Sequence, residues 1–127
     1  MVCVMDVVAS MLGVADIENV FTTAPARRTC ATPIVVQAAE FEQIAEGKHA
    51  GRWTALVPVL VVAESAMEGY HRARLCSRAL NEQDWHGLDA EDVGVRGVAA
   101  GMPSYRGTDS GGYFMWRVDA RLTCETV

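Results

Sequence analysis

The segment that most constrains the fold of this sequence is RWTALVPVLVVAE, residues 52–64. Both of its alternating sets of side chains are apolar, a pattern typical of a strand that is covered on both faces. In a chain of 127 residues one layer of helices covers one face of such a strand, and we expect a partner subunit to cover the other. Pro58 lacks the amide proton that a sheet ladder needs, so it predicts a bulge or a locally unpaired edge. The two sets are Trp53, Ala55, Val57, Val59 and Val61, and Leu56, Leu60 and Val62.

Two further strands are predicted before this segment. The run IVVQAAEFE (34–42) is β-branched and then mixed, and the polar, glycine-containing QIAEGKHAG (43–51) suits a hairpin tip between it and residues 52–64. The run IENVFTT (17–23) predicts another strand, which ends at the breaker-rich TAPARRTCATP. The first half of the chain therefore contains a long hairpin, over residues 34–63.

A second long hairpin is predicted over residues 93–125. Its first strand is VGVRGVAAG (93–101), and the turn-rich MPSYRGTDSGG connects it to GGYFMWRVDARLTCETV, residues 111–127. In that last stretch one parity is apolar and the other carries Arg117, Asp119 and Arg121, so one face packs on the core and the other faces outward.

Two helices are predicted. Residues 3–12 have apolar side chains at helical spacing, and Gly13 lies where a C-terminal cap falls. Ser65 and Glu68 form the pattern of a capping box, which starts a helix that runs to about Asn81. One stripe of that helix is Ala66, Tyr70, Ala73, Cys76 and Leu80, and the opposite stripe is His71, Arg74, Arg78 and Glu82.

The predicted order is therefore α-β-β-β-α-β-β. It describes an α+β fold with a single mixed or antiparallel sheet, helices packed on one face, and long hairpins. Half of the residues are hydrophobic and 21% are charged, which is typical of a globular chain, and we expect residues 1–127 to form a single domain.

No pattern in the sequence indicates catalysis, a cofactor or a metal. The histidines have neither HxxxH nor CxxH spacing, and no GxSxG elbow is present. The glycine-rich RGTDSGG (106–112) lacks the terminal GK[ST] of a phosphate loop and precedes a strand, so it predicts a turn. The dispersed cysteines indicate reduced core thiols. These residues are His49, His71 and His86, and Cys3, Cys30, Cys76 and Cys124.

Net charge and hydropathy limit the kinds of partner and the cellular location that the sequence allows. The net charge of −5 argues against a surface that grips nucleic acid over its whole extent. Lys48 is the only lysine, and arginine suits ion pairs at subunit interfaces, although a GC-rich coding genome gives the same bias. The start MVCVMDVVASML lacks the basic region of a secretory signal, and ALVPVLVVA is too short to span a membrane, so we expect a soluble protein made in a cytoplasm.

Charged strand faces are the candidate interaction sites. Glu40 and Glu42 share one parity of a strand, where they either discourage uncontrolled pairing or meet arginines of a neighbour. Arg27, Arg28 and Arg52 are the counterparts that the sequence offers. The acidic residues between Asp84 and Asp92 are interpreted as a solvated loop.

Aromatic side chains are the candidate anchors of an interface. Two roles, interface anchor and core packing, are possible for Trp53, Trp116, Phe114 and Tyr113. Core packing is favoured for Trp116. The predicted subunit or partner interface comprises Glu40, Glu42, Arg52, Trp53, Arg117, Asp119 and Arg121.

Taken in order, these segments resemble a known family. They are a short amphipathic helix, a variable strand, a long hairpin ending in RWTALVPVLVVAES, a helix GYHRARLCSRAL, a strand VGVRGVAAG and the strand YFMWRVDARLTCE. This layout resembles the tail-terminator, or tail-completion, proteins of tailed bacteriophages, particularly the Mu-like myophage group. The resemblance spans roughly residues 3–125 and lies in element order and hydrophobic profile, with no short signature motif.

The resemblance implies structural work in a virion rather than an enzymatic activity, and no cofactor. Proteins of this family form a hexameric ring that caps the tail tube, stops its polymerisation and joins it to the neck or head-completion protein. The implied partners are other copies of the chain, the tail tube and the sheath proteins, with genomic DNA passing through the lumen without specific binding. The implied location is the tail or neck of a virion assembled in the host cytoplasm.

Two alternatives stay open. One, which the resemblance itself implies, is another phage neck or tail-tube component, because such proteins also work through contacts with neighbouring subunits and are not separable by sequence. The other is a small α+β ligand-binding or enzymatic domain, which requires a pocket where His71, His86 and a carboxylate converge.

Overall fold

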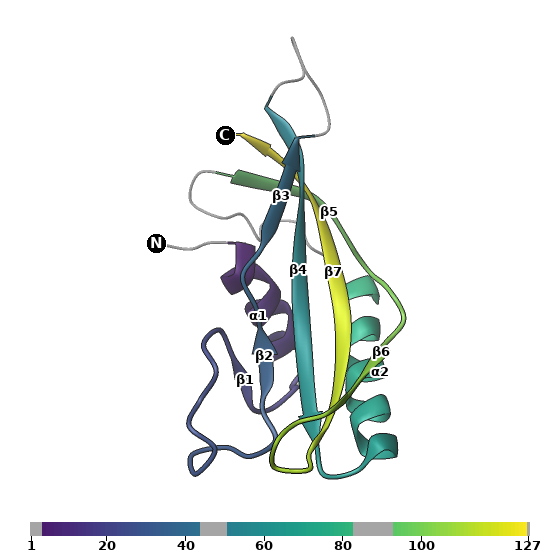
Figure 1. Ribbon diagram of the computed structural model, residues 1–127. Coiled ribbons are helices and arrows are strands. Elements are labelled where there is room, and N and C mark those ends of the chain that lie inside the picture. Colours follow the sequence, from purple (N-terminus) through teal and green to yellow (C-terminus); the bar gives the residue numbers. More distant parts are fainter. Residues whose placement is uncertain (1–3, 44–50, 83–92, 127) are drawn as a thin grey trace.

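We describe a computed structural model of the chain, which defines residues 4–43, 51–82 and 93–126. Two helices and seven strands occupy these ranges (Figure 1). In chain order they are α1 (Val4–Val14), β1 (Val20–Phe21), β2 (Ile34–Val36), β3 (Glu40–Gln43), β4 (Arg52–Ala63), α2 (Ala66–Glu82), β5 (Val93–Ala100), β6 (Ser104–Thr108) and β7 (Phe114–Thr126).

The sheet is built around the antiparallel pair β4 and β7. These strands pair along their whole length, from Arg52 opposite Glu125 to Ala63 opposite Phe114. On one side of the pair β4 bonds to β2 and β3, and on the other side β7 bonds to β5 and β6. The strand β1 runs parallel to β2, so the sheet is mixed. The long hairpin predicted from residues 34–63 and the pairing of 93–101 with the last strand are both confirmed.

Both helices lie on one face of this sheet, as predicted (Figure 1). The inward-facing side chains of β4 and β7 pack against the apolar stripes of α1 and α2. Residues that are fully buried in this core include Val8 and Met11 of α1, Val59 of β4, Cys76 of α2 and Leu122 of β7. The two helices also contact each other, so they form one layer.

The helix ends follow from local hydrogen bonds. At the start of α2 the Ser65 hydroxyl accepts the amide of Glu68 at 3.1 Å, which is the serine half of the predicted capping box. At the end of α1 the prediction of Gly13 as the cap is wrong. Asp16 has φ 60° and takes the left-handed cap position, while the Asp16 and Ile17 amides donate to the carbonyls of Gly13 and Leu12. This is a Schellman ending, with an aspartate where glycine is more common.

Pro58 explains a break in the neighbouring strand. The Gln37 amide donates to the Pro58 carbonyl at 2.8 Å, so the backbone polar groups of Pro58 face residues 37–39, between β2 and β3. The position where proline lacks an amide proton therefore faces the gap between β2 and β3, where no strand pairs with β4 on that side. The predicted strand 34–42 is consequently two short strands, and the locally unpaired edge expected at Pro58 is confirmed.

Two other strand predictions are corrected. The run 17–23 contributes only the two-residue β1. The turn-rich stretch after residue 101 contains a strand that was not predicted, β6, which pairs with β7 through Ser104 and Tyr105. The turn predicted over 106–112 is confirmed only for residues 109–112, where Gly112 has a positive φ, because residues 106–108 belong to β6.

Candidate functional site

The face of the sheet opposite the helices is the strongest candidate for an interaction surface, and we call it the helix-free face. Side-chain alternation along β4 turns Leu56, Pro58 and Leu60 toward this face, because Ala55, Val57 and Val59 point into the core. The three outward residues are half-buried, whereas their inward neighbours are fully buried. No helix of the described residues covers them. The expectation of a second cover over this strand stays a prediction.

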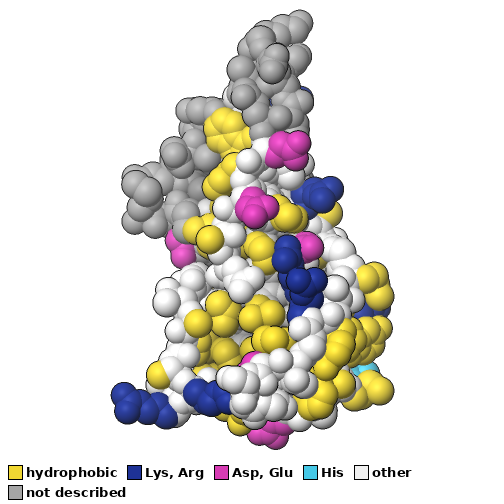
Figure 2. All heavy atoms as spheres, viewed as in Figure 1, with side chains coloured by type: hydrophobic (Ala, Val, Ile, Leu, Met, Phe, Trp, Pro, Cys, Tyr) yellow, Lys and Arg dark blue, Asp and Glu magenta, His cyan; other side chains and the backbone are white. Residues whose placement is uncertain are grey.

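The strand register arranges charge around this apolar strip. Glu40 of β3 lies opposite Leu56 of β4, which lies opposite Arg121 of β7. An acidic, an apolar and a basic side chain therefore follow one another across three strands. A shallow hollow of about 250 Å³, lined by these three residues with Phe41 and Glu42, marks the same place. Figure 2, which looks onto this side of the sheet, shows acidic and basic side chains interspersed with hydrophobic ones over the central strands.

Ion pairs within the chain order other charged side chains of this face. Arg117 Nε donates to Asp119 Oδ1 at 2.6 Å, both residues being on β7. Glu125 accepts from Arg52 at 2.8 Å and from Arg96 at 3.1 Å. Hydrogen bonds from Arg52, and then from Arg96, lower the pKa of the Glu125 carboxyl. Arg52 is therefore already engaged inside the chain, so it is a poorer counterpart for Glu40 and Glu42 than the sequence indicated.

The structure brings six of the seven predicted interface residues to one face. By strand parity Trp53 lies on the other face, because it is opposite the buried Cys124 and packs partly buried against the core. Its interface role stays a prediction, as do the roles of the other six. The residues on the helix-free face are Glu40, Glu42, Arg52, Arg117, Asp119 and Arg121.

Trp116 belongs to the helix side, as its predicted core role requires. Its indole Nε1 donates to the Ala66 carbonyl at 3.0 Å, and its ring lies 5.4 Å from that of Tyr70 and 5.2 Å from that of Tyr105. The half-buried indole thus joins β7 to the start of α2 and to β6. Its contacts within the chain account for its position without a partner.

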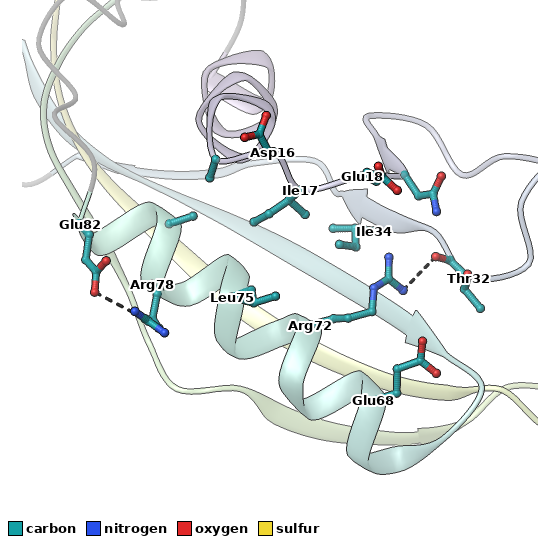
Figure 3. Close-up of a pocket in the computed structure, with 13 residues that line it drawn as sticks. Asp16, Ile17, Glu18, Thr32, Ile34, Glu68, Arg72, Leu75, Arg78 and Glu82 are labelled. Carbon is teal, nitrogen blue, oxygen red and sulfur yellow. Dashed lines mark hydrogen bonds and ion pairs between the residues drawn. The ribbon is translucent and has the colours of Figure 1, made fainter.

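A groove of about 550 Å³ lies on the helix side, between α2, β2 and the segment that follows α1 (Figure 3). Arg72 forms part of its wall and donates from Nη1 to the Thr32 carbonyl at 3.0 Å and to the Val62 carbonyl at 2.7 Å. Those two bonds tie α2 to the ends of β2 and β4, a structural role. The rest of the lining mixes apolar side chains such as Ile17 and Leu75, carboxylates such as Glu18 and Glu68, and the polar or basic Asn19, Thr32 and Arg78.

The groove does not bring together the acid–base groups that the hypothesis of an enzymatic domain requires. His71 lies outside its lining, on the exposed side of α2 where it was predicted. His49 and His86 lie outside the described residues. Within the ranges that the structure defines, no group of three or more His, Cys, Asp or Glu side chains is placed to hold a metal ion.

The cysteines of the described part are free thiols. Cys76 and Cys124 are fully buried, in agreement with the prediction of core thiols. Burial raises the pKa of Cys76 to about 11 and raises the pKa of Cys124 as well. Raised pKa values keep both groups as neutral thiols at neutral pH, which is unfavourable for a nucleophile.

Sequence reasoning missed one feature of this molecule. Arg74 and Arg78 were placed correctly on the outer stripe of α2, but that stripe was not considered as a contact surface. Together with Tyr70, His71 and Leu75 they line a hollow of about 460 Å³. The signal that was available is the apolar Leu75 within an otherwise polar stripe.

The described residues define an α+β protein with one helical layer and a sheet face that neither α1 nor α2 covers, and comparison with known proteins adds a structural likeness. No protein-family model and no curated protein matches the sequence. The fold is similar to that of a chain in the virion of a native gene transfer agent particle, with a TM-score of 0.59 and 17% sequence identity. The alignment covers 94% of this chain and 83% of that chain. At this identity the likeness establishes a shared fold.

A membrane-spanning helix was not expected, and among the described residues neither α1 nor α2 has the length and hydrophobicity to cross a bilayer.

Proposed function

We propose that this chain is a structural, non-enzymatic component of a phage-like virion, and in particular a tail terminator. In that role, copies of the chain form a ring, with six as the expected number. The ring caps the tail tube, stops its growth and joins it to the neck or head-completion protein. Genomic DNA passes through the lumen without specific binding, and sheath proteins are further neighbours.

The observation that carries this proposal is the half-buried apolar strip of β4 on the helix-free face, flanked by charged side chains in register. A strip of this kind gains stability when a partner covers it, and charges of both signs around it favour one partner and one alignment. The fold shared over most of its length with a chain of a gene transfer agent virion supports the same class of protein. The layout of the sequence, which resembles tail terminators, supports the particular role.

The experiment that tests the proposal uses tail tubes assembled from the tube protein of the same genome. Purified chain is added during tube polymerisation, tube lengths are measured by electron microscopy, and bound chain is quantified by sedimentation. We expect shorter tubes, with the chain bound at the tube ends in ring stoichiometry. Binding along the sides of the tubes, or no binding by a chain that stays monomeric, would contradict the role.

A matched pair of variants tests the surface. Arg121→Glu reverses a charge on the helix-free face, while Arg28→Glu makes the same change in an exposed loop before β2. We expect Arg121→Glu alone to weaken binding to the tube or to neighbouring subunits. Equal binding by both variants would remove the helix-free face from the proposal.

A further inference from the structure

Two separate places on the described surface combine exposed apolar side chains with charged ones. The part of the chain that the structure describes has only a few large hydrophobic side chains that are exposed, and most of them lie on α2 or around β6. Figure 2 shows hydrophobic side chains gathered at the edge of the molecule where α2 and β6 lie in Figure 1. These side chains are Met67, Leu75, Met102 and Tyr105 around α2 and β6, Phe41 on β3, and Val14 at the end of α1.

The first place is a stripe along α2, which we call the α2 stripe and define as Met67, His71, Arg74, Leu75 and Arg78. Met67 and Leu75 are 66% and 54% exposed. The stripe borders the hollow of about 460 Å³, which Tyr70 also lines. The stripe is basic, and its residues are exposed except for Arg74, which is half-buried. Arg74 donates to the sulfur of Met102, and Arg78 makes a 3.6 Å ion pair with Glu82 that is exposed on both sides.

The second place is the strand β3, whose residues Glu40, Phe41 and Glu42 we call the β3 edge. All three are exposed, and Phe41 is 59% exposed. Within the described ranges β3 pairs with β4 alone, so its other side is an open strand edge. The β3 edge is therefore an acidic segment with an aromatic side chain at its centre.

The two surfaces match in charge, chemistry and spacing. Glu40 and Glu42 point to the same side of a strand and lie about 7 Å apart. Arg74 and Arg78 are one helical turn apart, at about 6 Å. Phe41 points to the face of β3 opposite Glu40 and Glu42, so the two surfaces fit only when the open edge of β3 lies along α2, with the carboxylates toward Arg74 and Arg78 and the ring toward His71 and Leu75. A phenyl ring against His71, Tyr70 and Leu75 buries apolar surface on both partners.

The two surfaces also lie on opposite sides of the β4–β7 pair, as Figure 1 shows. One copy therefore does not join its own two surfaces, whereas the β3 edge of one copy can contact the α2 stripe of the next. A contact between two different patches is heterologous, and repetition of such a contact closes into a ring when the rotation allows it.

We propose that the subunit contact of the ring is formed by the β3 edge of one copy, Glu40-Phe41-Glu42, seated on the α2 stripe of its neighbour. This inference rests on the proposed function, because it names the two surfaces that join the subunits. It assigns Glu40 and Glu42 to arginines of α2 rather than to Arg27 or Arg52, which are paired with Asp109 and Glu125 inside the chain. The rest of the helix-free face stays available for other virion proteins.

Two charge-reversal variants test the contact. One is Glu40→Arg with Glu42→Arg, and the other is Arg74→Glu with Arg78→Glu. Each alone places like charges across the contact, so we expect self-association to weaken at least about tenfold. A mixture of the two restores an attractive contact on both sides of every subunit, so assembly should return, with alternating subunits. Masses are measured by analytical ultracentrifugation and native mass spectrometry, and folding is checked by circular dichroism.

The control and the contrary outcomes separate this inference from the function. Arg28→Glu should assemble like the wild type, and Phe41→Ser should weaken assembly without a charge change. Where a reversed variant does not fold, Arg74→Gln with Arg78→Gln replaces it. Unchanged assembly of the variants, or a mixture that stays dissociated, overturns the contact. A wild-type chain that is monomeric at every concentration also overturns it, while binding to tube ends in the separate tube assay would leave the proposed function standing.

Discussion

At the scale of single residues, a glycine in α2 illustrates how packing outweighs helix propensity. A Cβ atom at Gly69 would lie 2.6 Å from Cδ1 and 3.0 Å from Nε1 of Trp116, too close for the indole to stay in place. The helix therefore accepts glycine, at a propensity cost of about 1 kcal/mol, so that Trp116 can pack and bond to the Ala66 carbonyl. The lower helix propensity of glycine at position 69 is thus the local cost of a tertiary contact.

This reading predicts opposite effects for two glycine-to-alanine changes. Gly69→Ala should lower the free energy of unfolding by about 1–3 kcal/mol, since the displaced indole costs more than the helix gains. Gly13→Ala, where a Cβ meets no atom within 4 Å, should raise it by up to about 1 kcal/mol. Urea denaturation followed by circular dichroism measures both. Stabilisation by both changes would mean that Trp116 is not held by its contact with Gly69.

A second residue-scale prediction concerns the turn between β6 and β7. The Asp109 carboxylate accepts the amides of Gly111 and Tyr113 and pairs with Arg27 at 2.7 Å, and the Arg27 guanidinium lies over the Tyr113 ring. Desolvation tends to raise the pKa of Asp109, but the amide hydrogen bonds from Tyr113 and Gly111 and the charge of Arg27 outweigh it and lower the pKa. The ionised form is thus favoured in the folded chain.

A carboxyl whose folded-state pKa is lowered contributes stability above its unfolded pKa, about 3.9, and loses that contribution as the pH falls through the folded value. Asp109→Asn keeps an oxygen that accepts the two amides but removes the charge. We expect a small loss of stability at pH 7 that shrinks below about pH 4. Thermal unfolding of both proteins across this range measures the difference. A difference that stays constant with pH would show that the charge is not its cause.

At the scale of elements, the end of α2 is joined to the end of β5 by one side chain. Asn81 donates from Nδ2 to the Ala100 carbonyl and accepts the Ala100 amide at Oδ1, both at 2.9 Å. Ser77 adds a bond to the Gly101 carbonyl. Ala100 pairs with Ala120 of β7 on one side, and on the outer edge of β5, where the described residues provide no further strand, both polar atoms of Asn81 take the place of a strand neighbour. The last turn of the helix thus holds the strand end in place.

Asn81→Ala should therefore lower the free energy of unfolding by about 1 kcal/mol. The change removes two partly exposed hydrogen bonds, and the better helix propensity of alanine offsets part of that loss. Glu82→Ala is the matched control, because the exposed 3.6 Å pair with Arg78 contributes little. The midpoint of urea unfolding measures both. A loss in Asn81→Ala no larger than that of the control would contradict the role of this bond pair.

The elements differ in how far the sequence predicts them. Strand β7 has long, regular alternation, β4 is a long β-branched apolar run, and α2 has a capping box and an apolar stripe, so the existence of all three elements was predicted correctly. Strand β6 was missed because SYRGT is exposed, lies between proline and glycine, and owes its strand conformation to pairing with β7. The same limit applies to β1, whose two residues adopt the strand conformation because they pair with β2.

The candidate site was predictable only in part, for a related reason. Parity alone places Arg117, Asp119 and Arg121 together, because they belong to one strand. That Glu40 joins them depends on the register of β3 on β4 and of β4 on β7, which is a property of the folded sheet. The placement of the α2 stripe and the β3 edge on opposite sides of the β4–β7 pair depends on the whole topology, so no local pattern reveals it.

At the scale of the whole molecule, the sheet separates two kinds of surface. Its inner face, the two helices and Trp116 form one core, whereas its outer face carries the charged side chains and a half-buried apolar strip. Folding and assembly should therefore depend on different residues of the same strand. Trp116 and Arg117 are adjacent in β7 and point to opposite faces, which makes them a natural test of this separation.

Trp116→Asp should abolish folding, since it removes the indole from its contacts with Tyr70 and Tyr105 and places a carboxylate among apolar groups, at a cost above about 3 kcal/mol. Arg117→Glu should leave the fold intact, because the side chain lies on the helix-free face, and should impair assembly with the tail tube or other virion proteins. Arg117→Ser removes the charge without repelling Asp119, and it separates the loss of the ion pair from charge reversal. Circular dichroism reports folded protein, and sedimentation reports assembly. A similar loss of folded protein in both the Trp116 and Arg117 variants would show that the two faces are not independent, and the helix-free face would then be part of the folding core rather than a surface for partners.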